Sequence, residues 1–252
     1  MLLRRITKHV KDQNWFAVLI DLAIVVLGVF IGIQVANWNE ARQDQILASE
    51  YLKRLHADME LSITATERTK KFIADNTAGL GFVIDSLATC ELSEEDRDKF
   101  ANGINHAGKL VPATFVRGTL DELLSSGRIG LIKNTEIRDK LNEVTREMSY
   151  QASVWDSLHG RIRGLLHYID EKAAIRITEP ERRHGFGAAT WEELDIEFKA
   201  LCDDHKFDAA VTLQERMGYV NIDWLDRNLR NFQAARDTIA KEIELSAIGA
   251  NP

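Results

Sequence analysis

Residues 15–38 read WFAVLIDLAIVVLGVFIGIQVANW, and this stretch decides how the chain is organised. Its unbroken apolar core, from Leu22 to Ile33, has 12 residues, and with its flanks the stretch has 24. At ~1.5 Å per residue, a helix of that length spans roughly 36 Å, enough to cross a lipid bilayer. Trp15 and Trp38 stand at its ends, where aromatic rings favour the membrane interface. We therefore expect a transmembrane helix over residues 15–38.

A cleaved signal peptide is the main alternative to an anchor, because it also combines a basic start with an apolar stretch. Cleavage requires small residues at two positions just after the apolar stretch. Residues 34–36, Gln-Val-Ala, match that requirement only weakly. The sequence therefore favours an uncleaved anchor.

The positive charges near the anchor predict its orientation. Four of them lie within the first eleven residues, whereas after the anchor Arg42 is alone until Lys53. Positive charge is retained on the cytoplasmic side of a membrane. We therefore expect a cytoplasmic basic tail over residues 1–14 that contacts membrane lipid headgroups, and an extracytoplasmic domain over 39–252. This corresponds to a single-pass protein of a bacterial inner membrane, with most of the chain in the periplasm.

Small and polar residues share one face of the predicted anchor. Gly28 and Gly32 have the small-xxx-small spacing that lets two membrane helices approach closely, and Asp21 lies within about 20° of the same face. A carboxylate inside a membrane tends to mark a packed or functional surface. We interpret Asp21, Gly28 and Gly32 as a contact with a second copy or with another membrane protein. Two other readings remain open: glycine is common in membrane helices, and Asp21 is shallow enough to reach the interface.

The charge balance excludes one class of partner. The whole chain has a net charge of −7, and residues 1–42 contain five Lys or Arg and three Asp or Glu, a net charge of +2. The remaining residues therefore have a net charge of −9. Nucleic acid requires a basic face, so we expect no nucleic-acid partner.

The pattern beyond the anchor predicts an all-α fold. Only three prolines occur in the chain, which permits long helices. Apolar residues recur every seven positions from Leu52 to Leu87, as in a coiled coil, with one polar member, Thr66. A second apolar stripe runs from Ile137 to Ala173 and skips only Gln151, and a last helix is expected over about 207–247. We predict that the anchor helix continues into an antiparallel bundle of long helices.

Shorter elements are expected between the long ones. Ser93 with Asp96 resembles a capping box that starts a helix to about residue 107, and a further helix is expected over about 114–125. Asn134 is a predicted N-cap, and Thr190 with Glu193 forms another capping box. We interpret Gly160 and Gly164 in the long stripe as a place of close helix packing.

Catalytic and metal-binding motifs are hard to find. The sequence contains no metalloprotease motif, phosphate-binding loop, dinucleotide fingerprint or nucleophile elbow. Cys202 and His205 have metal-ligand spacing, but zinc needs a second such pair, so we expect no metal and no cofactor. Cys90 and Cys202 form one disulfide or remain free thiols. The basic loop at 182–184 offers an anion site or simply a solvated loop.

One part of the chain resembles a known family. Residues 26–42, VLGVFIGIQVANWNEAR, are similar to the N-terminal signature of a family of bacterial single-pass membrane proteins of unknown function. In that family an anchor rich in Gly, Val and Ile ends in an Asn-Trp-Asn-Glu type sequence. Residues 123–141, LLSSGRIGLIKNTEIRDKL, resemble the family more weakly. The resemblance implies location and architecture, and no activity.

The expected function is that of a non-enzymatic interaction, scaffold or regulatory protein of the bacterial cell envelope. A tail of about 14 residues is too short for a cytoplasmic signalling domain, so any cytoplasmic effect must pass through a partner. Two alternatives remain. A ligand-sensing domain requires a cavity between the long helices, and an envelope enzyme requires a site assembled from scattered residues.

Overall fold

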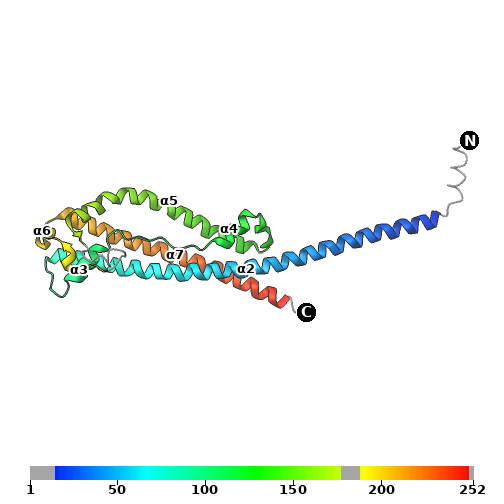
Figure 1. Cartoon of the computed structure of the whole chain (residues 1–252), viewed down its shortest axis with the longest axis horizontal. Coiled ribbons are helices and arrows are strands. Elements are labelled where there is room, and N and C mark those ends of the chain that lie inside the picture. Colours follow the sequence, from blue (N-terminus) through cyan, green and yellow to red (C-terminus); the bar gives the residue numbers. More distant parts are fainter. Residues whose placement is uncertain (1–14, 177–187, 250–252) are drawn as a thin grey trace, which may run out of the picture. The chain divides into compact units, whose positions relative to one another are not determined.

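The computed structural model describes residues 15–176 and 188–249. The chain divides into two units, Met1–Tyr51 and Leu52–Pro252. Helix α2 (Trp15–Thr89) contributes its first part to one unit and the remainder to the other. Almost all the described residues are helical, which confirms the predicted all-α class (Figure 1).

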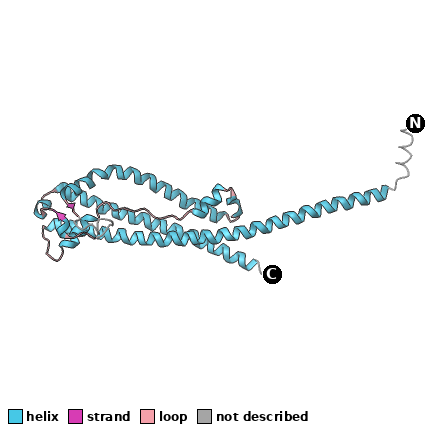
Figure 2. Ribbon diagram, viewed as in Figure 1, coloured by secondary structure: helices cyan, strands magenta, loops and turns pink. Residues whose placement is uncertain are grey.

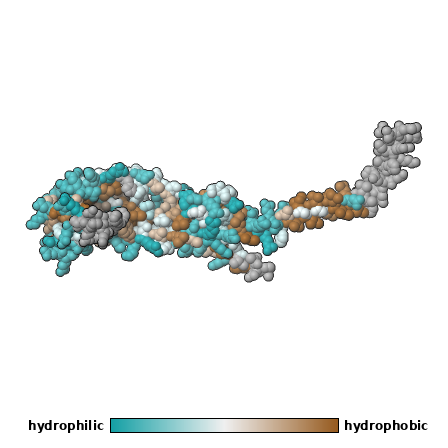
Figure 3. All heavy atoms as spheres, in the orientation of Figure 1, coloured by the Kyte–Doolittle hydropathy of each residue, from teal (hydrophilic) through white to brown (hydrophobic). Residues whose placement is uncertain are grey.

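The first unit is the N-terminal part of α2. Large apolar side chains cover it from Leu19 to Trp38 except on the face of Asp21, Gly28 and Gly32, and each of these apolar side chains is 41–65% exposed. Among the described residues, α2 is the one helix that is long and apolar enough to cross a membrane. The part of α2 that meets this description starts at Leu19. The same stretch is brown in the hydropathy view (Figure 3). An apolar surface of this extent suits a lipid environment better than water.

The second unit is built on three long helices: the part of α2 from Leu52 onward, α5 (Thr135–Lys172) and α7 (His205–Gly249). Shorter elements connect them, and the strands pair antiparallel (Figure 2). These elements are α3 (Arg97–Asn105), α4 (Gly118–Ser125), the 3-10 helix η1 (Arg128–Leu131), β1 (Ala174–Ile175), the 3-10 helix η3 (Trp191–Glu193), β2 (Leu194–Asp195) and α6 (Phe198–Cys202).

Cross-helix contacts fix the directions of the long helices. Between α2 and α7, Glu60 pairs with Arg236 at 3.1 Å, and Lys70 pairs with Asp226 at 2.6 Å. The residue number on α7 falls as the residue number on α2 rises, so these two helices run antiparallel. Helix α5 is also antiparallel to α7, because its N-cap Asn134 bonds Glu242 and its C-terminal turn reaches Asp204. The predicted antiparallel packing is therefore confirmed.

The heptad positions of α2 form part of the core. All six are at most 6% exposed, which confirms the predicted seam. Gly79 and Gly81 lie within the continuous helix. A Cβ on Gly79 would meet the Gly103 backbone at 3.4 Å, so the glycine permits α3 to pack closely. Helix α7 approaches the same helix at Gly218, where a Cβ would lie only 2.2 Å from Thr77 Oγ1.

The segment that connects α3 to α4 differs from expectation. The helix predicted over 114–125 begins only at Gly118, and the residues before it are extended. Side chains from the long helices bind the backbone of this segment: Ser62 Oγ accepts from Val116 N at 2.9 Å, and Asn221 Oδ1 accepts from Val111 N at 3.2 Å. Because its backbone groups are bonded in this way, the segment does not need helical hydrogen bonds.

Two further expectations are corrected. Helix α3 begins at Arg97, because Ser93 and Asp96 close a turn of their own before it. Gly160 and Gly164 are exposed, and a Cβ on either would meet nothing within 4 Å. The close packing predicted for these two glycines is therefore wrong.

Several predicted caps are confirmed. Asn134 accepts a hydrogen bond from Glu136 N and starts α5. Thr190 and Glu193 form the expected capping box. Helix α2 ends at Thr89. The next residue, Cys90, has a left-handed φ of 52° and is bonded to Cys202 at the end of α6. The sequence left open whether these two cysteines form a disulfide or remain free thiols, and in the structure they form the disulfide.

Candidate functional site

A cavity of about 230 Å³ opens between α5 and α7, under the extended segment that precedes α4. It lies entirely within the second unit, and its lining is largely apolar. The lining residues are Pro112, Ala113, Met148, Gln151, Ala152, Trp155, Asp156, Asn221, Trp224 and Leu225. This size and composition suit a small ligand with an apolar body.

The cavity lies at the middle of α5, where its apolar stripe is weakest. Leu141 and Ile169, toward the ends of the helix, are almost completely buried. Met148 and Trp155, at the middle, are only half-buried. Between them the stripe carries Gln151, and the neighbouring Ala152 is small. The facing helices therefore do not fill the space between them at this level.

Two tryptophans on opposite helices give the cavity its aromatic lining. The rings of Trp155 on α5 and Trp224 on α7 lie 5.8 Å apart between centroids and are tilted by 52°. Both residues are partly exposed. Indole rings offer a broad apolar surface and a negative π face.

The amide oxygens in the lining are already bonded to protein. Gln151 Oε1 accepts from Asn228 Nδ2 at 2.7 Å, and Gln151 Nε2 donates to Glu147 Oε1 at 2.8 Å. Asn221 Oδ1 accepts from the backbone of Val111. These bonds stabilise the cavity wall and occupy acceptors that a polar ligand would use.

Asp156 is the only charged residue among the described residues that line the cavity. Its side chain is exposed, and among the described side chains it has no ion-pair partner. The cavity therefore has a negatively charged edge and an aromatic, apolar interior.

The predicted contact residues of the anchor lie elsewhere. Asp21, Gly28 and Gly32 are exposed positions of α2 in the first unit. A Cβ on either glycine would meet nothing within 4 Å, so a neighbouring helix has room to approach. The contact itself stays a prediction. The predicted anion site at 182–184 lies outside the described residues.

The disulfide bears on the metal-ligand spacing of Cys202 and His205. Because Cys202 is bonded to Cys90, it has no thiolate to place beside His205. Among the described residues, no group of three or more His, Cys, Asp or Glu side chains could hold a metal ion.

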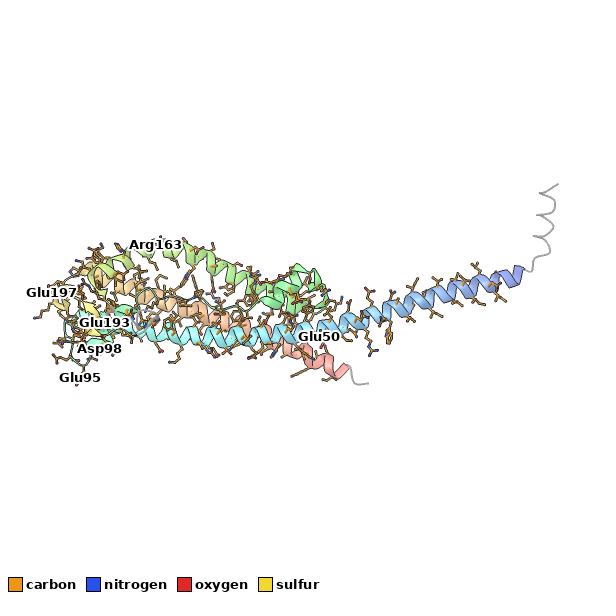
Figure 4. The ribbon with its side chains drawn as sticks, viewed as in Figure 1. Glu50, Glu95, Asp98, Arg163, Glu193 and Glu197 are labelled. Carbon is orange, nitrogen blue, oxygen red and sulfur yellow. A yellow bond between two sulfur atoms is a disulfide. The ribbon has the colours of Figure 1, made fainter. Side chains whose placement is uncertain are left out.

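Acidic side chains also gather at the end of the second unit where α3 and α6 lie; Figure 4 labels Glu95, Asp98, Glu193 and Glu197 there. Two of them act locally. Asp98 accepts from Trp191 N at 2.7 Å, and Glu193 accepts from Thr190 N at 3.0 Å. They stabilise the start of η3 and need no ligand to explain them.

A tyrosine–aspartate pair joins α5 to the start of α7. Tyr168 Oη donates to Asp204 Oδ2 at 2.7 Å, and Asp204 Oδ1 accepts from Phe207 N at 3.0 Å as the cap of α7. The hydrogen bond from Tyr168 lowers the pKa of Asp204. The same bond raises the pKa of Tyr168 to about 12. This pair is structural, because it caps a helix and lies apart from the cavity lining.

The cavity residues were missed by sequence reasoning, although a signal for them existed. Trp155 belongs to the predicted apolar stripe of the long helix, and the three-residue spacing of Asp156 and His159 predicts only a surface pair. The combination of a gap in the stripe at Gln151 with one tryptophan on α5 and one on α7 marks the level at which the cavity forms.

No family model, no curated protein and no solved structure matches this chain. The resemblance of residues 26–42 to a bacterial membrane-protein family therefore stays a prediction.

Proposed function

We propose that the protein is a membrane-anchored, non-enzymatic interaction and regulatory module of the bacterial cell envelope. One observation carries the proposal: the helix from Leu19 to Trp38 is exposed and, apart from the face of Asp21, Gly28 and Gly32, covered by large apolar side chains. In water such a surface is unfavourable by ~25 cal/mol for each Å² of apolar area, and a bilayer removes that cost. Residues 15–38 then lie in the inner membrane.

Two independent features support a periplasmic location for residues 39–252. The basic residues precede the anchor, which favours a cytoplasmic N-terminus. The second unit contains the Cys90–Cys202 disulfide, and disulfides persist in the periplasm but are rare in the cytosol. Both features give the same orientation by different chemistry.

Two contacts would link the module to its surroundings. The basic tail offers charges to anionic lipid headgroups. The anchor face with Asp21, Gly28 and Gly32 offers a helix contact to a second copy or to another membrane protein.

The orientation is tested by thiol modification in intact cells. The chain has two cysteines, so a mass-tagged maleimide reports directly on the disulfide. We expect labelling of both cysteines only after reduction. A variant with Arg4, Arg5, Lys8 and Lys11 changed to Gln should show a fraction of inverted, reduced protein. Free thiols in the wild-type chain, in cells that oxidise a periplasmic control protein, would overturn the periplasmic location.

The helix contact is tested by crosslinking the full chain in cells and recovering it in mild detergent. We expect Gly28→Ile with Gly32→Ile, or Asp21→Ala with Gly28→Ile, to lose the crosslinked partner. Val26→Leu is the matched control, because Val26 projects from the opposite face and should not affect the partner. Unchanged partners in the glycine variants would contradict the contact.

The cavity favours a second candidate function, a ligand-sensing domain. A ligand between α5 and α7 would contact both helices and stabilise one arrangement of the bundle over another. In a ligand-sensing domain of this kind, the anchor helix transmits the ligand-dependent change to a membrane partner.

A further inference from the structure

We infer that the cavity between α5 and α7 binds a small organic cation, a quaternary ammonium or an alkylated amine. The inference rests on the ligand-sensing form of the proposed function and names the ligand class of that cavity.

The aromatic lining provides the first argument. Trp155 and Trp224 come from facing helices, and their rings lie at 52° to each other rather than flat against one another. Both indoles line the cavity, and an aromatic lining of this kind suits a rounded cation such as a trimethylammonium group. A cation with alkyl substituents also gains from the apolar contacts of Met148 and Leu225.

The charge at the cavity provides the second argument. Asp156 is the charged group of the described lining, and no Lys or Arg lies among those residues. Residues 43–252 have a net charge of −9, which attracts cations and repels anions. An anionic ligand such as a carboxylate or a phosphate would meet only unfavourable charge.

The bonded amides provide the third argument. Gln151 and Asn221 use their oxygens for Asn228 and Val111. A ligand rich in hydroxyl groups, such as a sugar, would lose water without gaining these partners. A quaternary ammonium needs no hydrogen-bond partner, so the occupied amides cost it nothing.

The test uses the full chain in nanodiscs of phosphatidylglycerol, whose headgroup carries no amine. The five tryptophans are replaced by 5-fluorotryptophan, so that fluorine NMR reports on each ring. The probes are choline and its neutral isostere 3,3-dimethylbutan-1-ol, which differ in charge and share shape. We expect choline to move the Trp155 and Trp224 resonances and to bind about three- to tenfold more tightly than the isostere.

Asp156→Asn tests the role of the carboxylate without changing its size. We expect this variant to reduce the preference for choline by about two- to fivefold. Asp170→Asn is the matched control, because Asp170 is an exposed carboxylate on the same helix that does not line the cavity. It should leave the preference unchanged.

A second nanodisc preparation identifies the source of the cation. If phosphatidylcholine nanodiscs move the two resonances without added choline, the ligand is a lipid headgroup; if only free choline moves them, it is a soluble molecule. Equal binding of the neutral isostere would overturn the assignment to cations. Binding of neither probe would overturn the cavity as a cation site. The thiol-labelling experiment on orientation is independent of both results, so failure of the inference and failure of the proposed function are distinguishable.

Discussion

Asn228 on α7 donates a hydrogen bond over 2.7 Å to Gln151 on α5, and both side chains are buried. Asn221 precedes Asn228 by seven residues on α7, is about 1% exposed and accepts a hydrogen bond from Val111 N. Buried amides at heptad spacing fix the register of packed helices, because a shifted register would leave them without partners. This polar row sets α7 against its neighbours and holds one wall of the cavity in place.

The amide pair predicts a specific non-additivity. Asn228→Leu should destabilise the chain by about 1–3 kcal/mol, because it leaves the buried Gln151 Oε1 without its donor. The double variant Asn228→Leu with Gln151→Met should lose less than the sum of the two single variants, since both unpaired groups are then gone. Urea unfolding of the four proteins measures the coupling energy. Strict additivity would show that the pair contributes no mutual stabilisation.

The long helices could be read from the sequence because their signals are local. The seven-residue spacing from Leu52 to Leu87 identified the buried side of α2, and the stripe from Ile137 identified α5. Asn134 was recognised as a cap because its side chain bonds a backbone group two residues later. In each case the residues that decide the structure are neighbours along one helix.

The extended segment before α4 could not be predicted, because its determinants are distant in sequence. Thr119 N is bonded by Asp58 Oδ2 from α2, and Val111 N is bonded by Asn221 from α7. A side chain that caps a segment 61 or 110 residues away leaves no local pattern. The pairing of Cys90 with Cys202 had the same obstacle, since spacing alone does not give the distance between two thiols.

Two helical glycines should respond to alanine with opposite signs. Gly218→Ala places a Cβ 2.2 Å from Thr77 Oγ1, and the short threonine cannot move far, so we expect a loss of about 1–3 kcal/mol. Gly160→Ala meets open space on an exposed helical position and should gain up to about 1 kcal/mol. Thermal unfolding of both variants checks the pair. A stabilised Gly218→Ala would show that α2 and α7 do not approach closely there.

The Tyr168–Asp204 pair predicts a loss of stability at both ends of the pH range. The pKa of Asp204 is lowered, so its contribution is present above pH 3.8 and is lost as the pH falls through the lower folded value. The pKa of Tyr168 is raised from 10.0 to about 12, so its contribution is present below pH 10 and is lost as the pH rises toward 12. We expect the urea concentration at the unfolding midpoint to decrease at both acidic and alkaline pH, and to decrease less in Asp204→Asn than in the wild-type chain.

Ultraviolet titration of tyrosinate isolates the alkaline half of this prediction. The chain has four tyrosines, and Tyr168 should ionise near pH 12. In Asp204→Asn its pKa should return toward 10, because the carboxylate that accepts its hydrogen bond is gone. Tyr150→Phe is the control, since Tyr150 is 58% exposed and its replacement should leave the late ionisation of Tyr168 in place. A late ionisation that persists in Asp204→Asn would contradict the pairing.

The end of α2 predicts that two substitutions of one cysteine differ. Cys90→Ser and Cys90→Gly both remove a disulfide that joins residues 112 apart, and each should cost about 2–5 kcal/mol. Cys90 has a left-handed φ of 52°, which glycine adopts freely and serine does not. We therefore expect Cys90→Gly to be the more stable of the two by about 1 kcal/mol, as measured by urea unfolding under identical non-reducing conditions.

Cys202→Ser is the reference variant, because it removes the same disulfide and leaves Cys90 in place. Its stability should equal that of Cys90→Ser and be lower than that of Cys90→Gly. If the glycine variant is instead the least stable of the three, then the helix does not keep its left-handed end once the disulfide is gone, and the bond itself imposes that conformation.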